Sequence, residues 1–323
     1  MTGYFLGIDI GGTKSHALIA DPQGQVVGFG ECGAGSYEVV GWEGLHKALN
    51  LVTDRALASA GVGKEQLAGV GYGIAGYDWP SELPGHVEAI ESLKIAAPYA
   101  LVNDTIIGLM AGAADGWGAG VVSGTGSNCW GRDREGREAH MSGGGEMFAE
   151  YAGGGDLVRR AVQMVGLAWS WRGPQTRLCD AFIARTGAKD LDDLLEGLYV
   201  GHYTLSSDDA PLIFQVAAEG DEVALELVRW AGRELGSLAI GVIRQLGIES
   251  LAFDVVQIGS LYKGSPLMSE VMGATIAEVA PAARLVRLTV PPVVGAVMLA
   301  MEQAELDFRP LRETLIATGA SGR

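Results

Sequence analysis

The sequence predicts an α/β protein made of two lobes. Two observations support this fold class. Candidate strands alternate with candidate helices along the 323 residues, which is the pattern of α/β architecture. A unit of strand, glycine- and threonine-containing loop, strand and four-residue turn occurs near the N-terminus and occurs again after residue 117. Two such units at matched spacing suggest duplicated subdomains.

The first half contains the first unit, followed by a helix and two further strands. The helix is expected because Leu45, Leu49 and Val52 recur at helical spacing. Asp104 follows the last strand of this half and can serve as the N-cap of a short helix. The expected strands are 5–9, 15–20, 25–31, 67–74 and 99–103, and the expected helices are about 44–60 and 105–114.

The second half repeats the unit and then becomes richer in helices. The spacing from Thr13 to Asp21 equals that from Thr125 to Asp133, and each four-residue turn begins with Asp and ends with Gly. Chance similarity between two glycine-rich hairpins is the alternative explanation. The expected strands are 118–123, 128–132, 253–258 and about 284–288, and the expected helices are 156–168, 221–246 and 266–279.

Composition excludes several classes of function. The net charge of −16 argues against a nucleic-acid partner, because phosphate backbones are bound by basic patches. Cys32, Cys129 and Cys179 lack the spacing of a zinc site or a disulfide framework, which fits a reducing cytoplasm. The N-terminal residues do not have the pattern of a signal peptide. The longest apolar run, 288–301, is too short and too broken by prolines to span a bilayer, so we expect a cytoplasmic protein.

Two loops consist mainly of glycine and small polar residues: "GGTK" at 11–14 and "SGTGSN" at 123–128. Glycine lets the backbone approach a ligand closely, and successive backbone N–H groups form a concavity that favours anions. A simple hairpin turn is the alternative role, but a turn needs only one or two glycines. We therefore interpret the loops as phosphate-binding, with a nucleotide held between two lobes.

A third glycine pattern is interpreted differently. Residues 71–76 match G-x-G-x-x-G after a strand, but the sequence "YDWPSELPG" follows where a dinucleotide site would begin a helix. We expect a strand end and a loop near the cleft at this point. A P-loop motif, G-x-x-x-x-G-K-[ST], does not occur in the sequence.

Two carboxylates complete the candidate chemistry. Asp9 ends the first strand, and Asp104 directly follows the strand "YALVN". In an α/β sheet the carboxyl ends of the strands face the usual ligand crevice. Two carboxylates beside two phosphate loops suggest phosphoryl transfer, with one near Mg²⁺, usually through water, and the other accepting a proton from an attacking hydroxyl.

At this point four motifs carry a resemblance to a known family. The motifs "GIDIGGTK" at 7–14, "NDT" at 103–105, "SGTGSNC" at 123–129 and "IGSLYKG" at 258–264 resemble the N-acetylglucosamine kinase-like branch of the BadF/BadG/BcrA/BcrD ATPase family. This family lies in the actin-like ATPase and sugar kinase superfamily. The resemblance implies two actin-like, ribonuclease H-like lobes, each with a mixed five-stranded sheet and flanking helices, and a cleft between them. It implies lobes at 1–114 and 115–293, with a C-terminal helix, about 294–323, returning to the first.

The resemblance also assigns roles to individual residues. The implied ATP-binding residues are Gly11, Gly12, Thr13, Lys14, Gly124, Thr125, Gly126, Ala218, Gly259 and Ser260. Asp104 matches the catalytic base, which takes the proton of a sugar's 6-hydroxyl, and Asp9 matches the acid near Mg²⁺. The implied sugar-binding residues are Ser36, Asn103, Asp104, Gly143, Gly144, Gly145 and Glu150.

Three departures from the family pattern concern the sugar side. Ser36 stands where the family often has Asn, and Glu150 stands where it has Asp. Gly143–Gly145 replace a Gly-Trp-Gly sequence. A serine can still contact the substrate, through water if needed, and Glu150 keeps the charge but shifts the oxygens by a methylene. These changes leave the kinase chemistry in place and leave the identity of the sugar open.

The function implied by the resemblance is an ATP- and Mg²⁺-dependent kinase of an amino sugar, with N-acetylglucosamine first and glucosamine or another hexose next. The implied assembly is a homodimer with a small-molecule substrate. The same family includes ATPases that activate acyl-CoA dehydratases and reductases and hold an iron–sulfur cluster between subunits through thiolates. The scattered cysteines disfavour that alternative. A sugar-sensing regulator without catalysis is a third possibility, which the presence of Asp104 disfavours.

Overall fold

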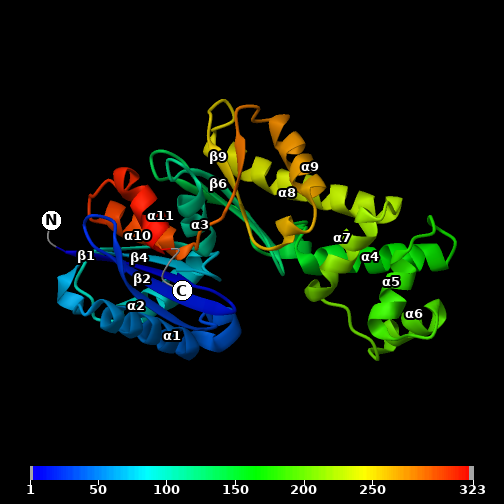
Figure 1. The fold of residues 1–323 in the computed structure, drawn as a ribbon, viewed down its shortest axis with the longest axis horizontal. Coiled ribbons are helices and arrows are strands. Elements are labelled where there is room, and N and C mark those ends of the chain that lie inside the picture. The colour runs from blue at the N-terminus through cyan, green and yellow to red at the C-terminus, as the bar shows by residue number, and fades with distance from the viewer. Residues whose placement is uncertain (1–2, 320–323) are drawn as a thin grey trace.

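The computed structural model describes residues 3–319 and contains two mixed five-stranded sheets (Figure 1). The first sheet has the order β3-β2-β1-β4-β5 and the second the order β10-β9-β6-β7-β8. The first sheet is made of β1 (Tyr4–Ile10), β2 (Lys14–Ala20), β3 (Val26–Gly33), β4 (Leu67–Ile74) and β5 (Tyr99–Asn103). The second is made of β6 (Gly118–Ser123), β7 (Ser127–Arg132), β8 (Glu138–His140), β9 (Asp254–Ile258) and β10 (Arg284–Arg287).

The two sheets share one topology. In each, the first three strands in sequence form antiparallel pairs, and the last two continue the sheet in parallel on the other side of the first strand. Reading the second sheet as β8-β7-β6-β9-β10 gives the order of the first. The predicted fold of two α/β lobes with mixed five-stranded sheets is therefore confirmed.

The repeated turn is identical in its hydrogen bonds. Asp21 Oδ1 accepts from the backbone N–H groups of Gln23 and Gln25, both at 2.9 Å. Asp133 Oδ1 accepts from the residues at the same offsets, Glu135 at 3.0 Å and Arg137 at 2.8 Å. An Asp side chain that satisfies the backbone two residues on is the reason why Asp begins such turns. This shared network makes chance similarity a poor explanation of the repeat.

Helices flank both sheets. Those of the first half are α1 (Tyr37–Ala60), α2 (Leu83–Glu91) and α3 (Asp104–Gly112). Those of the second half are α4 (Gly154–Trp169), α5 (Leu178–Thr186), α6 (Leu191–Val200), α7 (Ala210–Ala218), α8 (Glu222–Leu246) and α9 (Pro266–Ala277). The chain ends with α10 (Val293–Gln303) and α11 (Arg312–Gly319).

Helix α1 begins earlier than the expected start at about 44. Two helical segments join across Gly41, whose φ of 69° lies in the left-handed region that glycine tolerates. The expected N-cap of α3 is also wrong. Asn103, not Asp104, caps this helix, because its Oδ1 accepts from the N–H of Thr105 at 2.9 Å. Asp104 is the first residue of the helix, so its carboxylate is not needed as the cap.

Helix α10 packs against β1 and β4 of the first sheet, although these elements lie far apart in the sequence (Figure 1). A Cβ at Gly7 would lie 2.4 Å from the backbone N of Val297, and one at Gly71 would lie 2.1 Å from the carbonyl O of Ala296. Glycine in β1 and β4 therefore lets the helix approach the strands closely. The expectation of one C-terminal helix at about 294–323 is wrong, because this stretch is divided into α10 and α11, and its residues 320–323 lie outside the described residues. The limits of the lobes at 1–114 and 115–293 stay a prediction.

In the described part of the chain, no helix combines the length and apolarity that crossing a bilayer requires.

Candidate active site

The first glycine loop joins β1 to β2 and exposes three of its residues, Gly12, Thr13 and Lys14. The N–H of Gly11 donates to the carbonyl of Lys14 at 3.1 Å. A Cβ at Gly11 would lie 2.6 Å from that carbonyl oxygen, so the turn itself requires glycine there. A Cβ at Gly12 would meet only Val39, at 3.7 Å. Glycine at position 12 is thus not required by packing, which fits the close approach of a ligand.

The second glycine loop joins β6 to β7 and is held in place by hydrogen bonds to the segment 151–155. Ser123 Oγ donates to the carbonyl of Ala152 at 2.7 Å, and Ser127 Oγ donates to that of Tyr151 at 2.9 Å. Between these two anchors, Thr125 and Gly126 are exposed. A Cβ at Gly124 or Gly126 would meet nothing within 4 Å. The loop is therefore held by hydrogen bonds on one side, while no described protein atom covers the side on which a Cβ of Gly124 or Gly126 would lie.

A pocket of 610 Å³ opens beside this loop. It gathers four predicted ATP-binding residues from three separate segments: Gly124 and Thr125, Ala218 at the end of α7, and Ser260 after β9. Three further lining residues, Leu261, Lys263 and Gly264, lie within the motif at 258–264 but had no predicted role. The sequence missed the rest of the lining, which consists of Ser207, Asp208, Ala210, Pro211, Phe214 and Gln215. Its size and mixed lining suit a nucleoside.

Gly259 is not part of the lining. Its φ is 110°, and a Cβ there would lie 2.2 Å from the carbonyl oxygen of Ser123. This glycine lets the end of β9 pass close to the end of β6, and so brings Ser260 to the pocket. Its predicted ATP contact stays a prediction.

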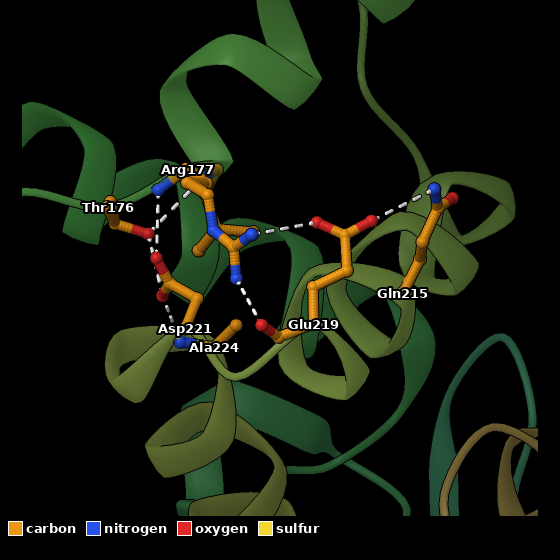
Figure 2. Close-up of polar contacts among 7 residues, drawn as sticks. Thr176, Arg177, Gln215, Glu219, Asp221 and Ala224 are labelled. Atoms are coloured by element: carbon orange, nitrogen blue, oxygen red, sulfur yellow. Dashed lines mark hydrogen bonds and ion pairs between the residues drawn. The ribbon is translucent and has the colours of Figure 1, made fainter.

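The pocket wall formed by α7 is held by a polar network at the turn 217–221, which ends this helix and which Figure 2 shows. Asp221 Oδ1 caps α8 by accepting from Ala224 N at 2.9 Å. The same carboxylate accepts from Thr176 Oγ1 and from the backbone N of Arg177, both at 2.9 Å. Arg177 also donates to the carbonyl of Glu219 at 2.6 Å. Asp221 is thus a structural residue that fixes the end of α7.

Asp9 and Asp104 lie together at the carboxyl ends of the strands of the first sheet. Burial, and then the charge of Asp104, raises the pKa of Asp9 to about 8. Burial, and then the charge of Asp78, raises the pKa of Asp104 to about 6. Asp104 is partly exposed, so a substrate can reach it. A carboxyl with a pKa near the working pH is suited to general-base catalysis.

Asp9 also suits a magnesium ion. The groups that raise its pKa are burial and another acid, so the site has excess negative charge that a cation would offset. Among residues 3–319 no group of three or more His, Cys, Asp or Glu side chains could hold a metal by itself. Mg²⁺ usually keeps several waters and binds through one or two carboxylates plus phosphates. The residues present fit that mode of binding.

Asp78 joins the two lobes beside this acid pair, and the sequence did not identify it. Asp78 lies in the loop after β4, and its Oδ1 accepts from Asn103 Nδ2 and from Asn128 Nδ2, both at 3.1 Å. Asn103 precedes Asp104, whereas Asn128 lies in β7 of the second sheet. The second glycine loop is therefore linked to the acid pair by two hydrogen bonds. The sequence predicted that the loop containing "YDWP" lies near the cleft. It did not identify Asp78, because the partners Asn103 and Asn128 are distant from this loop in the sequence.

Two predicted sugar-binding residues carry buried polar atoms without a partner among the described residues. Ser36 is 1% exposed, and its Oγ has no hydrogen-bond partner. Glu150 is 6% exposed, and while its Oε1 accepts from the N–H of Ser142 at 2.7 Å, its Oε2 has no partner. Buried polar atoms are nearly always hydrogen-bonded in a working protein. A polar ligand at these atoms would satisfy them.

The glycines at 143–145 lie in the loop between β8 and Glu150. Gly143 and Gly145 have φ values of 73° and 57°, so this backbone favours glycine. A Cβ at Gly143 would lie 3.3 Å from Cγ of Asp78. The loop of the second lobe therefore comes close to the Asp78 loop of the first. The carbonyl of Gly145 accepts from the N–H of Glu150 at 2.9 Å, and the sugar contacts of the three glycines stay a prediction.

Comparison with known proteins decides the family. The profile of the BadF/BadG/BcrA/BcrD ATPase family matches residues 6–300. The chain belongs to this family. Membership confirms the resemblance that the four motifs suggested. Because this is a family of ATPases, membership also confirms the prediction of an enzyme that uses ATP.

Relatives within the family match nearly the whole chain. An N-acetyl-D-glucosamine kinase from Dictyostelium discoideum is 26% identical, over 92% of this chain and 97% of that protein. An N-acetylmuramic acid/N-acetylglucosamine kinase from Clostridium acetobutylicum is 24% identical, over 94% of this chain and 99% of that protein. A solved structure of a candidate N-acetylglucosamine kinase from Chromobacterium violaceum has a TM-score of 0.62 at 23% identity, over 92% of this chain and 98% of that one. This structural likeness supports the fold.

Proposed function

We propose that this BadF/BadG/BcrA/BcrD family member is an ATP-dependent sugar kinase that phosphorylates the 6-hydroxyl of an amino sugar, with N-acetylglucosamine as the first candidate. The observation that carries the proposal is the link between pocket and base. The loop that lines the pocket with Gly124 and Thr125 continues into Asn128, which Asp78 ties to the residue preceding Asp104. Relatives that are named as kinases of N-acetylglucosamine support the same choice.

The proposed reaction is an in-line phosphoryl transfer. The nucleoside occupies the pocket, and the backbone N–H groups of the two glycine loops hold the phosphates. Asp104 takes the proton of the sugar hydroxyl as its oxygen bonds to the γ-phosphorus, and the bond from that phosphorus to the ADP oxygen breaks. Mg²⁺, when bound near Asp9, would offset the charge that develops on the phosphates.

The sugar is proposed to lie between Ser36 and Glu150. Their unpartnered oxygens, one in each half of the chain, are suited to hydroxyl or amide groups of a sugar. Ser36 is shorter than the Asn that the family often has, and Glu150 is longer than the usual Asp. The two changes place the available oxygens differently, so glucosamine or another hexose is the next candidate after N-acetylglucosamine.

The test is ADP release from the purified protein with Mg²⁺–ATP and a panel of sugars. The panel contains N-acetylglucosamine, glucosamine, N-acetylmuramic acid and glucose. Sugar-dependent release with an N-acetylated or free amino sugar, and a phosphorylated product at carbon 6 by NMR, is the expected result. A protein that hydrolyses ATP at the same rate with and without each sugar is not a kinase of these sugars.

The activator function is the less favoured alternative. An iron–sulfur cluster between subunits needs thiolates at the surface. Cys129 and Cys179 are buried, and burial raises the pKa of both thiols, so neither is poised as a thiolate. Iron analysis of protein purified without oxygen tests this point, and bound iron with sulfide would support the activator.

Three finer expectations belong to this proposal: Mg²⁺ as the metal, a homodimer and a cytoplasmic location. The Mg²⁺ requirement is checked by adding EDTA to the assay, and the assembly by light scattering. The net charge of −16 agrees with a well-solvated surface and with the absence of a nucleic-acid partner.

A further inference from the structure

Asp78 occupies an unusual place between the lobes. A single oxygen, Oδ1, accepts one amide from each lobe, Asn103 and Asn128. A carboxylate oxygen has two lone pairs, and a charged acceptor makes a stronger hydrogen bond than a neutral one. The loop that carries Asp78 is itself anchored, because Glu82 Oε2 accepts from the N–H groups of Asp78 and Trp79 at 2.8 Å each.

The chemistry of the two asparagines fixes which way their amides point. The Oδ1 of Asn103 accepts from Thr105 N at 2.9 Å, and the Oδ1 of Asn128 accepts from Cys129 N at 2.7 Å. In both residues the carbonyl oxygen must face a backbone N–H group, so the NH₂ group must face the other way, towards Asp78. Each amide can be satisfied in only one orientation, and Asp78 is the acceptor that both share.

Each asparagine adjoins a residue of the proposed reaction site. Asn103 caps α3 directly before Asp104, the proposed base. Asn128 lies three positions after Thr125 on the strand that leaves the second phosphate loop. An amide has two N–H donors, and Asn103 Nδ2 also donates to the carbonyl of Tyr77 at 3.2 Å, so the loop that carries Asp78 holds Asn103 at two points. The position of Asp78 therefore affects both the base and the phosphate loop.

We propose that Asp78 is a positioning residue for phosphoryl transfer, holding the Asn103–Asp104 pair of one lobe and Asn128 of the other in a single arrangement. The inference rests on the proposed kinase function. Asp78 acts through the two amides, not by contact with the reacting atoms. In this arrangement, Asp104 and the second glycine loop both face the sugar hydroxyl that receives the phosphoryl group.

The test compares Asp78→Ala and Asp78→Asn in steady-state assays with the best sugar of the panel. Asp78→Ala removes the shared acceptor, and we expect kcat/KM for the sugar to fall about 10- to 100-fold, since small misplacements of reacting groups have effects of this size. The KM for ATP changes less than kcat/KM for the sugar, because Asp78 does not itself line the pocket. Asp78→Asn keeps a carbonyl acceptor at the same place and restores most of the loss.

A double-mutant cycle shows whether Asp78 acts through Asn128. If it does, Asp78→Ala has a smaller effect in an Asn128→Ala background than in the wild type, because the partner is already absent. Equal effects in both backgrounds would mean that Asp78 does not act through Asn128, and would overturn the proposal that it holds groups of both lobes in one arrangement. Asp307→Ala, an exposed carboxylate beside Arg309, is the control for loss of an acidic side chain.

Two further outcomes separate this inference from the function it rests on. If the wild type releases no ADP with any sugar, both the kinase function and the role of Asp78 fail. If the wild type is active and Asp78→Ala is equally active, only the role of Asp78 fails. Thermal unfolding of each variant is measured beside the kinetics, and if Asp78→Ala fails to fold, the Asp78→Asn variant decides: kcat/KM for the sugar more than about tenfold below wild type would overturn the proposal.

Discussion

The carboxyl group of Asp9 lies within electrostatic range of Asp104, whose charge adds to burial in raising the pKa of Asp9 to about 8. The pKa of Asp104 is raised to about 6 by burial and by Asp78. Ionising both groups in the unliganded protein is therefore costly. The carboxyl end of the first sheet therefore holds a cluster of acids that destabilises the fold and favours binding of a cation. Such clusters of perturbed acids are common at functional sites.

The first prediction concerns stability and pH. An Asp whose folded pKa is raised keeps its proton after the unfolded chain has lost it, between about pH 4 and pH 8, so folding stability falls as pH rises through that window. Asp9→Asn removes this penalty. We expect it to raise the free energy of unfolding at pH 8 by at least about 1 kcal/mol, and by less at pH 5.

Urea denaturation without nucleotide at both pH values measures this effect. Asp307→Asn, at an exposed position, serves as the control and should change little at either pH. A gain for Asp9→Asn that is the same at pH 5 and pH 8 would contradict the raised pKa.

The second prediction concerns the pH dependence of turnover. As a general base Asp104 must be ionised, and its pKa of about 6 sets the point below which the base form is lost. We expect kcat/KM for the sugar to decline by about tenfold per pH unit below pH 6. Because kcat/KM for the sugar reports groups of the enzyme before it binds sugar, the assay is run at subsaturating sugar with ATP held at saturation. A flat profile down to pH 5 is incompatible with Asp104 as the base.

The third prediction removes the base. Asp104→Ala should lower sugar-stimulated ADP release by about 100-fold or more, the usual contribution of general-base catalysis. ATP binding should persist, because Asp104 does not line the 610 Å³ pocket in which we propose that the nucleoside binds. Activity and nucleotide affinity, by isothermal calorimetry, are measured on the same preparation. Unchanged turnover in the variant would remove Asp104 from the mechanism.

The two-lobe fold could be predicted because its signals are local. Asp21 and Asp133 begin turns whose hydrogen bonds lie within five residues, so their sequence spacing carries the structure directly. Gly11 is likewise demanded by the carbonyl of Lys14 three positions on. The N-cap at Asn103 was missed because Asp and Asn are equally good caps, and sequence alone does not fix the first helical residue.

The parts that sequence could not supply depend on distant contacts. Asp78 takes its significance from Asn103 and Asn128, which are 25 and 50 positions away. Phe214 of α7 reaches the pocket beside Ser260 only because the packed second lobe brings these two segments together. Helices α5, α6 and α7 also escaped notice, because each is short and tertiary packing decides such elements more than local propensity does.

The fourth prediction concerns Gly126, which is exposed in the second glycine loop. A methyl group at Gly126 meets nothing within 4 Å, so Gly126→Ala should fold normally. If phosphates approach this backbone, the methyl group would obstruct them, and we expect the KM for ATP to rise on the order of tenfold. Gly166→Ala, at an equally open glycine in α4, is the matched control and should leave the KM unchanged. Equal KM values for the two variants would separate the loop from the nucleotide.

The fifth prediction concerns Ala218, in the pocket where we propose that the nucleoside binds. Ala218 is exposed at the end of α7 and lines the pocket, whereas Ala58 is exposed on α1, far from it in sequence. Leucine forms helices almost as well as alanine, so neither Ala218→Leu nor Ala58→Leu should weaken its helix by more than a few tenths of a kcal/mol. The larger side chain at position 218 reduces the space left for the nucleoside. We expect Ala218→Leu to raise the KM for ATP by about tenfold and to leave the KM for the sugar unchanged, with Ala58→Leu kinetically silent. A rise in the sugar KM alone would place the sugar, and not the nucleotide, in this pocket.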